Sequence, residues 1–136
     1  MKFYISSLFS EKERVREIYK EIVSRGHEIT YDWTKHEGVT IVERDEKIDI
    51  VQQYAINDVN AVKDSDVFVI LTEPLGGRTQ YAELGVAIMS HMVYGKPLIY
   101  AVGKETNQVT FYYHPCVRRK KTLDEILDDL KIPAKD

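Results

Sequence analysis

Apolar residues recur three and four positions apart in four segments of the chain, the spacing that places side chains on one face of a helix. The pattern predicts helices over residues 11–25, 48–64, 81–94 and 122–130. Between them lie short apolar runs. The run at residues 66–71 is continuous, which is typical of a central parallel strand covered on both faces. Further strands are expected at residues 2–6, 28–31, 97–102 and 116–119.

Predicted strands and helices alternate along the whole chain. The expected fold class is therefore α/β: a doubly wound, flavodoxin- or Rossmann-like parallel sheet of about five strands with helices on both faces. A length of 136 residues suits one domain and is short for two, so we interpret residues 1–136 as a single domain in which 131–136 form a frayed tail.

Ligands of such sheets bind beyond the carboxyl ends of the strands, where the strand order reverses. Ser6, Ser7 and Phe9 follow the first strand and are candidates for contacting a substrate. Residues 32–47 are charged and weakly periodic, and so long a connector indicates a function. We interpret this segment as a mobile loop over the site.

Charge and composition narrow the classes of partner. The net charge is −3 and the pI is about 5.8, so a nucleic acid polymer is not expected to bind, and the basic run at residues 118–121 fits a solvated surface. Cys116 is the only cysteine, and neither a second cysteine nor a His pair at ligand spacing indicates a metal site. The chain shows no apolar stretch typical of a signal peptide or membrane span, so we expect no membrane partner and a cytoplasmic location.

Glu83 lies shortly after a loop that contains two glycines, in the first turn of the helix expected over residues 81–94. The helix dipole and free N–H groups at that end favour an ionised carboxylate. A charged carboxylate beside a ligand can attack a carbon with positive character, as in glycoside cleavage. Position alone does not decide the role, because a glutamate that only complements the dipole at an exposed helix end is also found there.

Asp58 projects from the apolar side of its predicted helix, three residues after Ala55 and four before Val62. An unpaired carboxylate at such a place costs several kcal/mol, so something must compensate it. Asp58 either reaches the crevice, where it moves a proton or holds a sugar hydroxyl, or it is a structural residue bonded to nearby backbone or to a tyrosine.

The loop before Glu83 contains Gly76, Gly77, Arg78 and Thr79. Its backbone N–H groups, a guanidinium and a hydroxyl are suited to a phosphate, although a plain turn explains the same residues. Trp33 lies just past a strand end, where it either stacks on a base or packs in the core.

Three pieces of the chain, in this order and spacing, carry a resemblance to a known family. They are Phe3-Tyr4-Ile5-Ser6-Ser7, Asp58 eight residues ahead of the strand at 66–69, and Tyr81-Ala82-Glu83-Leu84-Gly85-Val86-Ala87. Over about residues 2–103 the chain resembles the nucleoside 2-deoxyribosyltransferase-like family, which includes the 2′-deoxynucleoside 5′-monophosphate N-glycosidases. The resemblance implies that Glu83 is a nucleophile that forms a covalent glycosyl intermediate, and that Asp58 and Tyr4 are active-site residues.

The chain also departs from the family's pattern. The transferases bind the base with acidic residues in the loop before Glu83, and residues 76–80 replace them here, which favours a phosphorylated substrate. In the monophosphate glycosidases a serine of this loop contacts the phosphate, where this chain has Arg78 and Thr79. The resemblance further implies a homo-oligomer in which a neighbouring subunit completes the pocket with the segment that holds Asn107 and Thr110.

The hypothesis from the sequence is therefore cleavage of the N-glycosidic bond of a nucleoside, a deoxynucleoside or its 5′-monophosphate. Glu83 would form the glycosyl intermediate, and water would release ribose, deoxyribose or its 5-phosphate. No metal or organic cofactor is expected, because the carboxylate supplies the nucleophile. Two alternatives remain: a transferase that exchanges bases, and a non-catalytic nucleotide-binding sensor.

Overall fold

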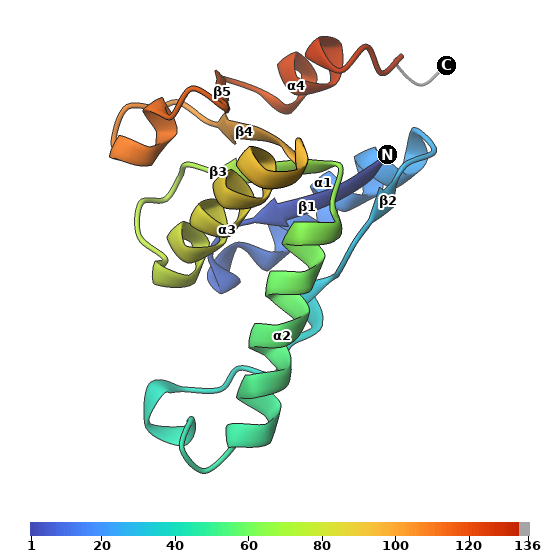
Figure 1. The fold of residues 1–136 in the computed structure, drawn as a ribbon. Coiled ribbons are helices and arrows are strands. Elements are labelled where there is room, and N and C mark those ends of the chain that lie inside the picture. The colour runs from blue at the N-terminus through green and yellow to red at the C-terminus, as the bar shows by residue number, and fades with distance from the viewer. Residues whose placement is uncertain (134–136) are drawn as a thin grey trace.

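The computed structural model describes residues 1–133 and has the alternating order of strands and helices that the sequence predicts. All five strands are parallel and lie in the order β2-β1-β3-β4-β5 (Figure 1). The strands are β1 (Lys2–Ser6), β2 (Glu28–Ile29), β3 (Val67–Leu71), β4 (Leu98–Val102) and β5 (Val117–Lys120). The helices are α1 (Lys12–Ser24), α2 (Ile48–Asp64), α3 (Arg78–Tyr94) and α4 (Leu123–Asp129). The predicted fold class is confirmed.

Helices cover both faces of this sheet. Figure 1 shows α2 and α3 side by side in front of it and α1 behind it. The C-terminal segment lies on the same face of the sheet as α1. Arg25, at the end of α1, has its Nη2 3.8 Å from Oδ1 of Asp124, and its Nη1 donates to the carbonyl of Pro133 at 3.3 Å. Every residue of β3 is buried, as its continuous apolar run predicts for a central strand.

Three boundaries differ from the predictions. Helix α3 begins at Arg78, three residues before the expected start, because the loop turns into the helix directly after Gly77. Strand β2 has only two paired residues. The expectation of a frayed tail is wrong for Ile132, which is buried and donates its N–H to the carbonyl of Leu127. Residues 134–136 of that predicted tail lie outside the described part of the chain.

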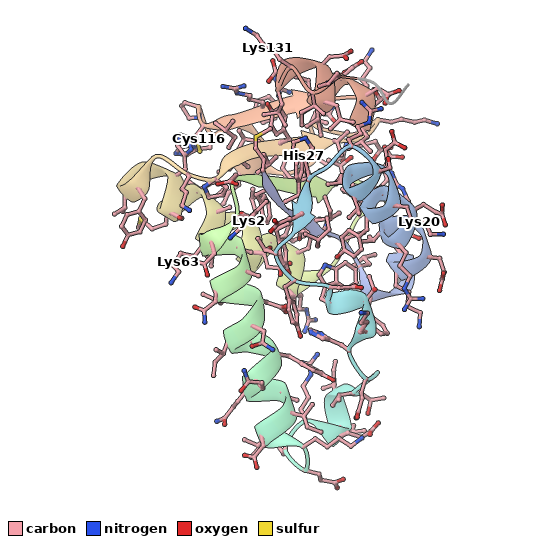
Figure 2. The ribbon with its side chains drawn as sticks, turned by 90° about the vertical axis from the view of Figure 1, so that its right-hand side faces the viewer. Lys2, Lys20, His27, Lys63, Cys116 and Lys131 are labelled. Carbon is pink, nitrogen blue, oxygen red and sulfur yellow. The ribbon has the colours of Figure 1, made fainter. Side chains whose placement is uncertain are left out.

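The segment before α2, residues 32–47, contains two short 3-10 turns, Trp33–Lys35 and Ile41–Glu43. Most of the first turn is buried against the core, whereas the residues after it extend away from the sheet together with the N-terminal half of α2 (Figures 1 and 2). His36 fastens the segment to α2, because its ring stacks on Tyr54 with 3.7 Å between centroids. Its Nε2 also lies 2.7 Å from the Tyr31 hydroxyl.

Within residues 1–133, no helix combines the length and the apolar character that a membrane crossing requires.

Candidate active site

The order of the strands reverses between β1 and β3. The chain passes from β1 to one edge of the sheet at β2, and from β3 toward the other edge through β4 and β5. A pocket of about 490 Å³ lies at the carboxyl ends of these two strands, a size in the range of small-molecule sites. Its walls come from β1 and the turn after it, from α2, from the start of α3, and from the segment before α2.

Glu83 is held at the base of this pocket by two hydroxyl groups of β1. Tyr4 donates a hydrogen bond to Oε2, and Ser6 donates one to Oε1 at 2.9 Å. Tyr4 and Ser6 are two positions apart on one strand, so they face the same side of the sheet, toward α3. Glu83 is only 7% exposed, and both of its carboxylate oxygens have a donor. The carboxylate is therefore fixed in orientation.

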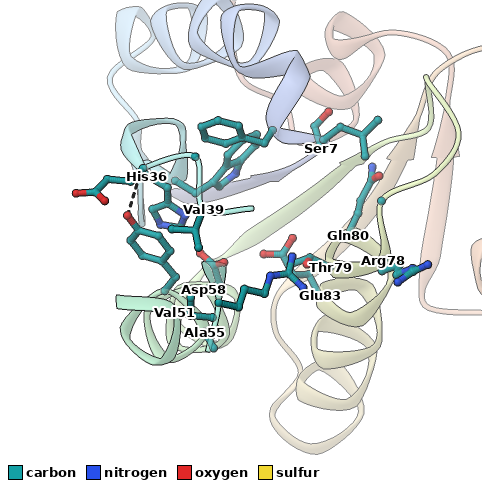
Figure 3. A pocket seen from close by; sticks show the side chains of 18 of the residues that line it. Ser7, His36, Val39, Val51, Ala55, Asp58, Arg78, Thr79, Gln80 and Glu83 are labelled. Atoms are coloured by element: carbon teal, nitrogen blue, oxygen red, sulfur yellow. Dashed lines mark hydrogen bonds between the residues drawn. The ribbon is translucent and has the colours of Figure 1, made fainter. Parts of the chain in front are cut away.

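Asp58 faces Glu83 from the opposite wall (Figure 3). Val51, Ala55 and Asp58 follow one another on α2 at spacings of four and three residues, and all three line the pocket. Oδ1 of Asp58 is buried and has no hydrogen-bond partner within residues 1–133. Of the two alternatives for Asp58, the geometry matches the one in which the side chain reaches the crevice.

The pKa values of both carboxyl groups are higher than those of exposed Glu and Asp side chains. Burial raises the pKa of Glu83 from 4.5 to about 8, the hydrogen bond from Tyr4 opposes this, and the nearby charge of Asp58 adds to it. Burial also raises the pKa of Asp58, from 3.8 to about 6, against the effect of Tyr4. Groups that interact this closely titrate as a pair, so between about pH 6 and about pH 8 the pair holds one proton.

The sequence predicted the opposite effect on Glu83, an ionised form favoured by the first turn of a helix. The expectation is wrong because α3 begins at Arg78, which makes Glu83 the sixth residue of the helix and places it beyond the first turn. Burial is therefore the main influence on the pKa of Glu83, and it raises that pKa. Tyr4 stays a neutral donor, because burial and the charges of Glu83 and Asp58 raise the pKa of its hydroxyl well above 10.0.

Gly77 and the first turn of α3 form another part of the wall. Gly77 has a φ of +87°, and a Cβ at this position would lie 2.4 Å from Cδ2 of Leu8. The positive φ favours glycine, and a Cβ here would also force the Leu8 side chain to shift. Arg78 and Thr79 follow it and line the pocket, although Figure 3 shows the Arg78 side chain extending away from the two carboxylates.

Ser7, Phe9 and Trp33 line the pocket as well. The Ser7 hydroxyl is buried without a partner inside the described range, 1–133. Trp33 is 6% exposed, and its Nε1 donates to the carbonyl of Ile5 at 2.6 Å. It therefore serves as a core residue with one edge at the cavity.

Asn107 and Thr110 do not join this group. Both are exposed on the connection between β4 and β5, and neither lines the pocket of a single chain.

Several lining residues were not predicted. From the segment before α2 come His36, Glu37, Gly38, Val39 and Arg44, from α2 come Val51, Tyr54 and Ala55, and from α3 comes Gln80. The spacing of Val51, Ala55 and Asp58 is a signal that the sequence contained. The residues of the segment have no periodicity, so only the folded chain shows which of them turn inward.

Among residues 1–133, no three His, Cys, Asp or Glu side chains gather in a way that would hold a metal ion.

No family model and no curated protein matches this sequence. Among solved structures, the chain is similar to the CMP N-glycosidase BcmB of Clostridium botulinum, with a TM-score of 0.61. The similarity covers 98% of this chain and 100% of that one, at 14% sequence identity. At this identity the match shows that the two proteins share a fold over their whole lengths.

Proposed function

We propose that the protein hydrolyses the N-glycosidic bond of a nucleoside 5′-monophosphate or nucleoside, with Glu83 as the nucleophile. The observation that carries the proposal is the pair of facing carboxyl groups, of which Glu83 is oriented by Tyr4 and Ser6. Most enzymes that cleave glycosidic bonds use two carboxyl groups, one on each side of the bond. The resemblance of the sequence and the shared fold with a CMP N-glycosidase support the same reaction.

In the first step, one oxygen of Glu83 attacks C1′ of the sugar. The bond between C1′ and the base nitrogen breaks, its electron pair stays with the base, and a proton from Asp58 neutralises the leaving group. This step needs one ionised and one protonated carboxyl group, and a pair that holds one proton supplies both. In the second step, Asp58 takes a proton from water, the oxygen of that water bonds to C1′, and Glu83 leaves as a carboxylate.

This assignment requires the proton of the pair to be on Asp58 when the base departs, although burial is greater at Glu83. Tyr4 donates to Glu83 and also acts on Asp58, so it lies where a proton can pass between them. A hydroxyl with a raised pKa accepts one proton as it gives up another, and it carries no net charge before or after the transfer.

The phosphate of a nucleotide fits the side of the pocket formed by Gly77, Arg78 and Thr79. Backbone N–H groups at the start of α3 and the cationic side chains of Arg44 and Arg78, which line the same cavity, favour an anion. We therefore expect monophosphates to be better substrates than nucleosides. Ser7, Phe9 and Trp33 are the proposed contacts for the sugar and base.

The test is incubation of the purified protein with each common nucleoside and its 5′-monophosphate, with chromatography of the products. We expect free base to appear from at least one monophosphate and not with Glu83→Ala. Release of base by Glu83→Ala at the rate of the unchanged protein would contradict the proposal. Incorporation of an added second base would indicate the transferase, and tight binding of an intact nucleotide would indicate the sensor.

We also expect a second copy of the chain to pack on α2 and α3. Apolar residues line the outer side of α3 at spacings of four, three and four positions, namely Ala82, Val86, Met89 and Val93. Met89 and Val93 are each 62% exposed. Ile56 and Val59 of α2, the helix that contacts α3, are also 53% and 47% exposed. Helices with apolar residues on more than one side are typically covered by a partner.

A further inference from the structure

Gln80 lies buried where β1 and β3 end, with 2% of its surface exposed. Its Nε2 donates hydrogen bonds to the carbonyl oxygens of Leu71 and Ser6, the latter at 3.4 Å. Ser6 is the last residue of β1 and Leu71 the last of β3, and these strands are neighbours in the sheet. One side-chain amide therefore joins the two strands at the point where their order reverses.

Chemistry fixes which end of the amide faces the strands. A carbonyl oxygen only accepts, so the NH2 group must lie toward both carbonyls, and its two hydrogens supply the two bonds. A Glu side chain of the same length loses both donors when it is ionised, and a Met side chain has none. Among side chains of this length and neutral charge, glutamine alone can bridge two carbonyls in this way.

The bridge is connected to the proposed nucleophile. Gln80 and Glu83 are three positions apart on α3, so they lie on the same side of the helix. Gln80 binds the backbone carbonyl of Ser6, and the side chain of Ser6 binds Oε1 of Glu83 at 2.9 Å. The three residues form a closed ring of contacts between α3 and β1, and a displacement of Gln80 would move Glu83 relative to its donors.

We propose that Gln80 is a positioning residue, which sets the place of the Glu83 carboxylate against Tyr4 and Ser6 by tying the first turn of α3 to the ends of β1 and β3. It needs no contact with the substrate for this role. The expected effect on turnover rests on the proposed function, whereas the expected effect on the Glu83 carboxyl group itself does not.

The first experiment compares Gln80→Met with the unchanged protein. The substitution keeps the length of the side chain and removes both donors. Because a displacement of about 1 Å at a reacting group can lower a rate roughly a hundredfold, we expect kcat to fall by about ten- to a hundredfold while KM changes by less than about threefold. Gln53→Met is the matched control: it removes an exposed hydrogen bond to Asn57 from a side chain outside the pocket, and it should leave kcat unchanged.

The second experiment follows the ionisation of Glu83 directly, by carbon NMR of the glutamate carboxyl groups, with Glu83→Gln to assign the signal. In Gln80→Met the donors Tyr4 and Ser6 hold the carboxylate less well, so its titration should move to higher pH. The other titratable groups that act on it, Asp58 from α2 and Tyr19 from α1, are present in both proteins. His36, Arg44 and Arg78, which line the same pocket, are also unchanged.

An unchanged Glu83 titration in Gln80→Met would overturn the inference, whether or not kcat falls. If that variant does not fold, Gln80→Glu replaces it, because its protonated form still donates one hydrogen bond and its ionised form donates none. Its activity relative to the unchanged protein should then fall as the pH rises, and a constant ratio would count against the role of the amide.

The two proposals fail in different ways. If the unchanged protein releases base from no nucleotide or nucleoside, the proposed function fails, and the NMR titration still decides the role of Gln80. If the unchanged protein is active and the titration of Glu83 is the same in Gln80→Met and Gln53→Met, only the role of Gln80 fails.

Discussion

The hydroxyl of Tyr4 donates to the carboxylate of Glu83, although the two residues are 79 positions apart in the sequence. The contact exists because β1 and α3 meet where the strand order reverses. It supplies an orienting donor to a carboxyl group whose burial otherwise favours the protonated form. The residues that create the site are thus the residues that hold together two distant parts of the fold.

Tyr4→Phe should lower kcat/KM by about ten- to a hundredfold. The substitution removes one hydrogen bond to a charged group, a contribution of roughly 1.5–3 kcal/mol, and each 1.4 kcal/mol is about a factor of ten in rate. Because this bond lowers the pKa of Glu83, the acid side of the pH profile should also move to higher pH. Steady-state kinetics from about pH 5 to about pH 9 measure both effects. Tyr94→Phe, at a tyrosine that is 71% exposed, is the control and should behave as the unchanged protein.

The dependence of kcat/KM on pH should be bell-shaped, with its maximum between about pH 6 and about pH 8. Below this range both carboxyl groups are protonated and no nucleophile is present; above it both are ionised and no acid is present. In Asp58→Asn the fall at high pH should disappear. The single rise that remains is the ionisation of Glu83, and it should lie at a pH no lower than in the unchanged protein, because on that limb Asp58 is already uncharged. A profile of Asp58→Asn with the same two limbs as the unchanged protein would contradict the assignment.

Glu83→Gln should abolish turnover and stabilise the fold at neutral and alkaline pH. The native protein keeps a proton on Glu83 that the unfolded chain releases, so the free energy of unfolding falls as the pH rises from about 4.5 to about 8. Glu83→Gln has no titratable group at this position, so its free energy of unfolding does not fall for this reason. Its Tm should exceed that of the unchanged protein at pH 8, and the difference should shrink toward pH 4.5. Thermal unfolding in a series of buffers gives the comparison, and equal Tm values at pH 8 would contradict it.

Gly77→Ala should destabilise the protein and weaken nucleotide binding. Its positive φ strains any residue with a Cβ, and the added carbon would overlap Leu8. We expect a loss of at least about 1 kcal/mol in the free energy of unfolding, from denaturant titration. Gly85→Ala is the matched control: its added Cβ meets nothing within 4 Å in a helical segment, so it should leave the stability unchanged or raise it.

Met89→Glu should convert an oligomer into monomers, because it places a charge in the middle of the apolar surface of α3. Light scattering coupled to gel filtration measures the change. Val23→Glu introduces the same charge at a residue of α1 that is 56% exposed, and it should leave the oligomer intact. A monomeric unchanged protein would contradict the expected oligomer.

The sequence predicted the architecture well because the signals for it are local. The buried run of β3 and the helical spacing of α1 and α2 are set by neighbouring residues, and each element formed close to its predicted bounds. The start of α3 was missed because the loop before it contains no residue that caps a helix through its side chain, and Gly77 takes the position instead.

The candidate site could be predicted only in part. Glu83, Asp58 and Tyr4, to which the resemblance gives active-site roles, lie at one pocket, and their roles stay predictions. The protonation of Glu83 was not predictable, because it depends on burial by segments distant in the sequence. The bridge made by Gln80 depends on two strand ends that meet only in the folded chain.

After its first 3-10 turn, the segment before α2 rests on the projecting half of that helix, away from the sheet (Figure 2). Glu83, Tyr4 and Ser6 belong instead to the packed core at the strand ends. Mutation can therefore reshape the outer part of the pocket while the reacting groups stay in place. Over evolutionary time, related chains with this design are expected to diversify in the molecules they accept faster than in the chemistry they perform.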